Sequence, residues 1–94
     1  MTADIQHDAD KQVFTYIEEG QPSVIEYQMR PGNLMVITHT GVPEALGGRG
    51  IASRLARHAL DHARAQGYKV RPACPFVDTY MRRHPEYEDL RQAG

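Results

Sequence analysis

The sequence predicts an α+β domain, in which a meander of three antiparallel strands leads to a long helix, a fourth strand and a short helix. Two observations carry this prediction. Up to residue 40, three short segments rich in β-branched and aromatic residues are separated by turn residues. After residue 50, apolar residues recur with the 3.6-residue period of a helix. The 94 residues are expected to form one domain, residues 1–94, because so small a core cannot be divided and still offset chain entropy.

The three strands of the predicted meander cover residues 12–17, 23–29 and 34–40. The clearest turn between them is Pro31-Gly32-Asn33, which precedes the third strand. Such short connections favour an antiparallel arrangement. Residues 1–10 are polar, and we expect them to be frayed.

The long helix is predicted to begin at Ile51 and to end near Gly67. Apolar residues stand at positions 51, 52, 55, 56, 59, 60 and 63, which form one stripe of a helix. Gly67 stands where a helix C-terminus favours a left-handed residue. His58 and His62 lie off the stripe. Their spacing of four is similar to that of a zinc-protease helix, but the general-base Glu and a third ligand are missing. We therefore expect two solvated histidines and no metal.

The segment after the helix, residues 68–74, is predicted to be a strand. Because its connection to residues 34–40 runs through the long helix, the two strands can lie side by side and parallel. Residues 76–83 suit a short helix that Pro85 would end. The remaining segment, residues 86–90, can add one last turn.

Composition excludes several classes of function. With 11 Lys+Arg against 12 Asp+Glu the net charge is -1, which gives no general attraction to nucleic acid or to an anionic membrane. Basic residues nevertheless outnumber acidic ones between residues 49 and 71, so a polyanionic ligand is expected there. The single cysteine, Cys74, excludes an intrachain disulfide. The first residues do not resemble a signal peptide and no apolar run approaches the length of a membrane span, so we expect a soluble cytoplasmic protein.

A glycine-rich turn precedes the long helix. Gly47, Gly48 and Gly50 lie between the third strand and the helix N-terminus, where unpaired backbone N–H groups and the helix dipole favour a phosphate. Arg49 adds a cation. The Walker spacing is absent, which argues against a nucleoside triphosphatase. On these residues alone, a flexible loop leading into a helix remains an equally good interpretation.

Residues 42–55 resemble motif A of the GNAT acetyltransferase superfamily, (Gln/Arg)-x-x-Gly-x-(Gly/Ala). Gly50 and Ala52 match its last two positions, whereas Gly47 departs from the Gln/Arg of the first. Two further landmarks are similar to those of the short single-domain GNAT-like N-acetyltransferases. They are the His-Thr-x-Val-Pro segment at residues 39–43 and the Cys-Pro-Phe segment at residues 74–76.

The resemblance implies a minimal GNAT-like fold that uses acetyl-coenzyme A as cosubstrate. The pyrophosphate would be cradled by the glycine-rich turn and the first helical residues, and the main chain before the turn would run beside the pantetheine, where the two parallel strands splay apart. The residues so implied are Gly47, Gly48, Arg49, Gly50, Ile51, Ala52 and Ser53 for the pyrophosphate, and Thr40, Gly41 and Val42 for the pantetheine. Gly47 lacks the usual side chain, so it would weaken this binding rather than abolish it, and Arg49 would partly replace it.

Cys74 and His39 are the candidate catalytic residues. Cys74 can attack the thioester or protonate the departing thiolate, but free cysteines are also often buried and inert. His39 can act as a general base, or can be a structural histidine, since alternation places it on the same strand face as Met35 and Ile37. Tyr80 lies on the predicted short helix, where GNAT enzymes often place a tyrosine acid, but core packing is the better interpretation of it.

Three functions remain open at this stage. The first is an N-acetyltransferase that moves acetyl from acetyl-coenzyme A to a small amine or a protein lysine. The second is a non-catalytic acyl-coenzyme A binding module, since so short a chain lacks the elements that form the acceptor pocket of larger GNAT enzymes. The third is nucleic-acid binding through the basic helix, which the absence of interleaved aromatic residues argues against.

Overall fold

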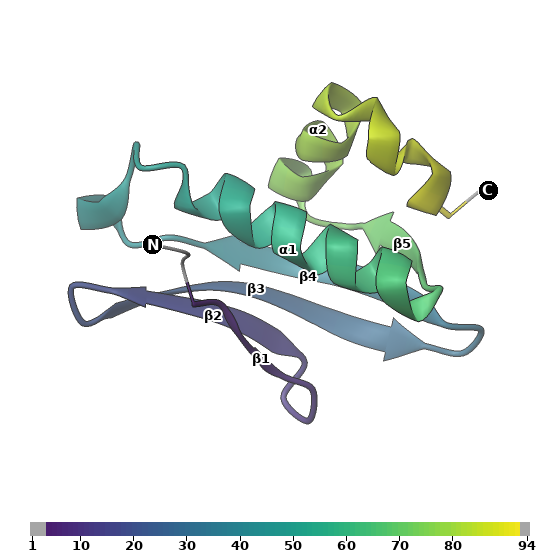
Figure 1. Cartoon of the computed structure of the whole chain (residues 1–94), viewed down its shortest axis with the longest axis horizontal. Coiled ribbons are helices and arrows are strands. Elements are labelled where there is room, and N and C mark those ends of the chain that lie inside the picture. The colour runs from purple at the N-terminus through teal and green to yellow at the C-terminus, as the bar shows by residue number, and fades with distance from the viewer. Residues whose placement is uncertain (1–3, 93–94) are drawn as a thin grey trace.

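The computed structural model describes residues 4–92 and has five strands and two α-helices. The strands form one sheet in the order β1-β2-β3-β4-β5 (Figure 1). Successive strands from β1 to β4 pair antiparallel, whereas β4 and β5 are parallel. The α+β fold with one parallel pair is thus confirmed. In chain order the elements are β1 Gln6–Asp8, β2 Val13–Glu18, β3 Gln21–Arg30, β4 Leu34–Gly41, the 3-10 helix η1 Glu44–Leu46, α1 Ile51–Gln66, β5 Lys69–Pro72, α2 Pro75–Arg83 and the 3-10 helix η2 Pro85–Leu90.

Strand β1 is a correction to the sequence analysis. Residues 1–10 were expected to be frayed, but β1 pairs with β2 from Gln6↔Thr15 to Asp8↔Val13; residues 1–3 lie outside the described part of the chain. Only one side chain of the strand, His7, faces the core, where its ring stacks on Phe14 at 4.1 Å. A polar residue therefore attaches this strand to the core, and its sequence lacks the alternation of apolar and polar residues that predicts a strand.

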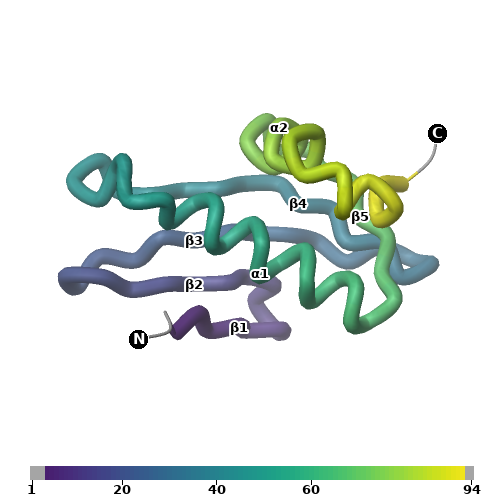
Figure 2. Tube along the Cα trace, turned by 45° about the horizontal axis from the view of Figure 1, so that its top comes forward, coloured from purple at the N-terminus to yellow at the C-terminus, as the bar shows by residue number. Residues whose placement is uncertain are grey.

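The helices all lie on one face of the sheet, with α1 crossing over the strands and α2 beside it (Figures 1 and 2). The predicted apolar stripe of α1 is buried on this face except for half-buried Ala52, and Gly67 ends the helix with φ 75°. The stripe packs on Phe14, Ile25 and Ile37 of the sheet, which are fully buried. Each large apolar side chain buried in this way stabilises the fold by roughly 1.5–3 kcal/mol. No helix within residues 4–92 is long and apolar enough to span a membrane.

A β-bulge in β4 changes which way its last residues point. Tyr27 pairs with Ile37, but the residue before it in β3, Glu26, pairs with His39, so Thr38 is the extra residue. Cross-strand partners share a face. His39 therefore lies with exposed Glu26 on the open face of the sheet, and is itself exposed. The expectation that His39 shares the core face of Met35 and Ile37 was wrong, because alternation fails across a bulge.

The segment after α1 also differs from the prediction. Strand β5 ends at Pro72 rather than at residue 74, and Cys74 is the N-cap of α2. Ion pairs and hydrogen bonds hold the C-terminal elements to α1. The Tyr87 hydroxyl donates to Asp61 Oδ1 at 2.7 Å, and Arg64 binds Asp89 at 2.9 Å. These contacts hold η2 against α1, and the ion pair of Arg91 with Asp78 at 2.7 Å ties the end of η2 to α2.

Candidate functional site

The glycine-rich turn forms an uncapped helix N-terminus. Gly50 is the N-cap of α1 with φ 75°, and no side chain caps the helix. The first helical hydrogen bond runs from the N–H of Arg54 to the carbonyl of Gly50, so the N–H groups of the preceding turn have no intrahelical partner. The first turn contains no acidic residue. Unpaired donors and the positive end of the helix dipole make this terminus a suitable place for an anion.

Two glycines of the turn have backbone conformations that other residues rarely adopt. Gly48 and Gly50 have φ of 80° and 75°, and a Cβ atom at either position would meet nothing within 4 Å. The space beside them is therefore open, and a ligand can approach the main chain closely. Gly47 differs, because its φ of -61° is accessible to any residue.

A hollow of about 210 Å³ opens at this helix terminus. Within the described structure, its lining gathers most of the residues predicted to bind the cofactor. They are Val42, Gly47, Gly48, Gly50, Ile51, Ala52 and Ser53, together with Leu46 and Phe76.

Arg49 was predicted to bind the pyrophosphate, but its side chain points away from the hollow. Its guanidinium binds the carboxylate of Glu18 at 2.5 Å, at the end of β2, and that of Glu19 at 2.7 Å, in the turn that follows. These hydrogen bonds raise the pKa of Arg49. Arg49 does not line the hollow. Its charge is instead neutralised by two acidic residues that the sequence does not mark as neighbours.

The edge of β4 is free just where the candidate site continues. The β4–β5 ladder ends at Ile37↔Pro72, although β4 itself runs on to Gly41. The N–H groups of Ala73 and Cys74 both turn back to the carbonyl of Ile37, at 3.0 and 3.1 Å. The two strands therefore separate at this point, as the predicted splay requires. Thr40 and Gly41 lie on the unpaired length of β4.

Cys74 lies at the point of separation. Its Sγ atom is 3.3 Å from Oγ1 of Thr40, to which the thiol donates. Thr40 pairs with fully buried Ile25, so this contact lies on the helix face of the sheet. Only 6% of Cys74 is exposed.

His39 lies on the opposite face of the same strand. A Cβ atom at Gly41 would lie 3.0 Å from the imidazole Nε2, so the ring covers the Cα of that glycine. The two catalytic candidates thus flank the free edge of β4 from opposite faces and do not contact each other. Across the strand from His39 stands Glu26.

Sequence reasoning missed a second hollow, of about 110 Å³, between α1 and α2. Three rings one turn apart line it: Phe76, Tyr80 and His84. The rings of Tyr80 and His84 stack at 3.9 Å, and Phe76 is 38% exposed. Burial raises the pKa of Tyr80. The i, i+4, i+8 spacing of these rings was visible in the sequence, but nothing there placed them beside the glycine turn.

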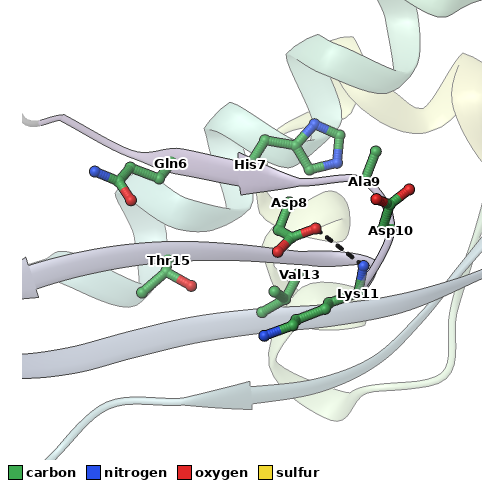
Figure 3. A pocket seen from close by; sticks show the side chains of 8 residues that line it. All are labelled: Gln6, His7, Asp8, Ala9, Asp10, Lys11, Val13 and Thr15. Carbon is green, nitrogen blue, oxygen red and sulfur yellow. Dashed lines mark hydrogen bonds between the residues drawn. The ribbon is translucent and has the colours of Figure 1, made fainter.

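A wider hollow of about 580 Å³ lies at the other end of the sheet, by the β1–β2 turn (Figure 3). Most of its polar residues are exposed, and Asp8 Oδ1 accepts a hydrogen bond from the N–H of Lys11 at 3.1 Å. It adjoins neither the helix terminus nor Cys74. We therefore take the smaller hollow at the glycine turn, and not this larger one, as the candidate functional site.

Of the two α1 histidines that were expected to be solvated, His58 is exposed but His62 is not. His62 is half-buried and meets His7 edge-on at 4.6 Å, and its pKa is lowered by burial and by His58. The described residues contain no group of three or more His, Cys, Asp or Glu side chains arranged to hold a metal ion.

Comparisons with known proteins agree with this geometry. The chain is 31% identical to the protein NATD1 from Gallus gallus over 83 residues, which is 86% of this chain and 76% of that protein. The Homo sapiens NATD1 is also 31% identical, with 86% and 74% covered. The NMR structure of a GCN5-like protein from Staphylococcus aureus superposes with a TM-score of 0.77 at 26% identity, covering 98% of this chain and 90% of that one. The family model of the GCN5-related N-acetyltransferases matches residues 12–90, and the chain belongs to that family.

Proposed function

We propose that this protein binds acetyl-coenzyme A and transfers the acetyl group to an amine, of a small molecule or of a protein lysine. One observation carries the proposal: the uncapped N-terminus of α1, the hollow beside it and the free edge of β4 form one path that ends at Cys74. An acyl-coenzyme A fits such a path, because the helix N-terminus suits its phosphates and the strand edge suits its pantetheine arm.

The phosphate end is matched by the first turn of α1. The unpaired N–H groups of residues 51–53 can donate to the pyrophosphate, and the glycines at 48 and 50 leave room for it. No carboxylate of the first turn opposes the negative charge. Main-chain N–H groups can therefore bind the pyrophosphate even though Gly47 has no side chain to do so.

The pantetheine end is matched by β4. Beyond Ile37 the ladder with β5 has ended, so the backbone groups of residues 40–41 that do not pair with β3 are available to the amides of a pantetheine lying alongside. Val42 lines the hollow and connects this edge to the glycine turn. The thioester would then reach the position between Cys74 and His39.

Transfer forms a C–N bond and breaks a C–S bond. The amine nitrogen attacks the thioester carbonyl carbon and loses a proton, while the sulfur of coenzyme A leaves and gains one. His39 lies on the open face of the sheet, where it can accept the proton of an incoming amine. Cys74 can protonate the leaving sulfur directly, or attack first to form an acetyl-cysteine that the amine then cleaves.

Mass spectrometry of the intact protein separates these two routes. Incubation with acetyl-coenzyme A and no amine gives one added acetyl group if Cys74 is the nucleophile, and Cys74→Ala then abolishes the adduct. If Cys74→Ala acquires the adduct as fast as the wild type, Cys74 is not the nucleophile. An unmodified wild type that still releases coenzyme A when an amine is added indicates direct transfer.

A charge placed at the helix terminus tests the binding site itself. Ser53→Glu introduces a carboxylate into the first turn, where it favours the helix but repels a pyrophosphate. Ser53→Gln has nearly the same shape without the charge. We expect Ser53→Glu to weaken coenzyme A binding by about tenfold or more relative to Ser53→Gln, measured by calorimetry. Equal affinities of the two variants for coenzyme A would show that the pyrophosphate does not bind at this terminus.

A non-catalytic acyl-coenzyme A binding module is the second candidate. It is favoured by the open face of the sheet, on which His39 lies, since in the described structure the helices cover only the other face and form no wall of an acceptor pocket here (Figure 1). Such a module binds coenzyme A tightly but releases no thiol with any amine. Thiol release above the rate of hydrolysis with any amine in a panel would exclude it.

A further inference from the structure

We propose that the hollow between α1 and α2 is a nucleotide subsite, in which Phe76 holds the adenine ring and Arg83 binds the 3′-phosphate of coenzyme A. This inference rests on the proposed function, because it concerns the part of the cofactor that extends beyond the pyrophosphate.

The two hollows adjoin each other. Ser53, on the first turn of α1, and Phe76, on α2, line both of them. A ligand with its pyrophosphate at the N-terminus of α1 can therefore extend past Phe76 without leaving a continuous surface depression. The pantetheine occupies the other direction, along β4.

The wall of the second hollow suits a purine. The rings of Phe76, Tyr80 and His84 succeed one another along α2, with Phe76 and Tyr80 stacked at 6.4 Å. The rings of Tyr80 and His84 stack on each other, and His84 Nδ1 binds the carbonyl of Tyr80 at 2.8 Å. Phe76, 38% exposed at the end of the row, has a free face. A base stacked on an aromatic side chain gains about 1–3 kcal/mol.

The cation at this hollow is available. Arg83 lines it and is exposed, and within the described residues it makes no ion pair. Its neighbour Arg82 is bound to Asp78 at 3.2 Å and does not line the hollow. An arginine without a carboxylate partner, beside a free aromatic face, is the combination that recognises a phosphorylated nucleoside.

Calorimetry with coenzyme A and with 3′-dephospho-coenzyme A tests this subsite. We expect the wild type to bind coenzyme A about tenfold more tightly, because a guanidinium–phosphate contact is lost with the other ligand. Arg83→Gln should remove this preference by weakening only coenzyme A, and Arg83→Lys should keep part of it. Arg82→Gln is the matched control, and it should keep the full preference. Phe76→Ala should weaken both ligands equally.

The outcomes separate the two proposals. If the wild type binds both ligands equally, or if the preference survives Arg83→Gln, the subsite is wrong while coenzyme A binding stands. If neither ligand binds, the proposed function fails, and the subsite with it. Circular dichroism of each variant confirms that the exposed substitutions leave the fold intact.

Discussion

The thiol of Cys74 and the hydroxyl of Thr40 face each other across the gap between β4 and β5, with 3.3 Å between Sγ and Oγ1. The two residues are far apart in sequence and lie beyond the last ladder pair, Ile37↔Pro72. Their contact therefore lies where the strands separate, at the end of the path that begins at the N-terminus of α1.

This position predicts that coenzyme A protects Cys74 from alkylation. Only 6% of Cys74 is exposed, and a ligand whose sulfur reaches the gap covers that remaining surface, so iodoacetamide should react several-fold more slowly at saturating coenzyme A. Mass spectrometry of labelled protein over time gives the rate. Adenosine 3′,5′-bisphosphate, which lacks the pantetheine, is the control and should not protect. Equal rates with and without coenzyme A would place Cys74 off the path.

Gly47→Arg should strengthen coenzyme A binding by about threefold to tenfold, because it adds a charge-assisted contact to the pyrophosphate. The φ of -61° permits the substitution, although the new Cβ would lie 3.2 Å from the carbonyl of Glu44, which must shift slightly. Gly47→Ala carries the same Cβ without the charge and isolates that cost. Titration calorimetry of both variants decides the matter: an arginine no better than the alanine would show that the turn binds no phosphate here.

His39→Ala should slow acetyl transfer by about 100-fold or more while changing the free energy of unfolding by less than about 0.5 kcal/mol. The ring is exposed on the open face and carries no core packing, so its loss leaves the fold intact. Urea unfolding measures the stability, and coenzyme A release with an amine measures the rate. A variant of normal rate would exclude His39 as the base.

Acid should weaken the attachment of β1. Burial and the nearby His62 and His58 lower the pKa of His7, whose Nε2 lies 2.5 Å from the Tyr27 hydroxyl. A histidine with a lowered pKa binds fewer protons in the folded than in the unfolded state, so stability is complete above the ordinary value of 6.5 and declines as pH falls below it.

Urea unfolding of the wild type and of His7→Phe between pH 8 and pH 5 measures this decline. Phenylalanine keeps the ring stacked on Phe14 but cannot take up a proton, so the variant should lose less stability than the wild type over this range. The same loss in both proteins would mean that the histidines around β1 do not govern acid stability.

The predictable parts of this fold are those encoded by local patterns. The period of the apolar residues marks α1 correctly, and Gly67 marks its end, because a helix packed on one face needs only local information. β1 was missed because His7 is its sole contact with the core and stacks on a residue of another strand. The face of His39 was wrong because a bulge at Thr38 follows from strand pairing, which no local pattern reports.

The candidate site likewise contains some features that are local in the sequence and others that depend on tertiary packing. The glycines and the first helical residues do line one hollow, because they are consecutive in the chain and share one turn. Arg49, by contrast, is drawn to Glu18 and Glu19, some thirty residues earlier in the chain. Arg83 and Phe76 become neighbours of Ser53 only through the packing of α2 on α1. Contacts of this kind depend on tertiary structure and must be read from it.

The most direct test of coenzyme A binding is a ¹⁵N-HSQC titration of the protein with coenzyme A. We expect saturable shifts of the amide signals of Gly48, Gly50 and Ser53 at the helix terminus, and of Thr40 and Gly41 along β4, while signals around the β1–β2 turn stay in place. If saturating coenzyme A leaves the helix-terminus amides unmoved, or shifts only signals at the other end of the sheet, the proposed site is contradicted.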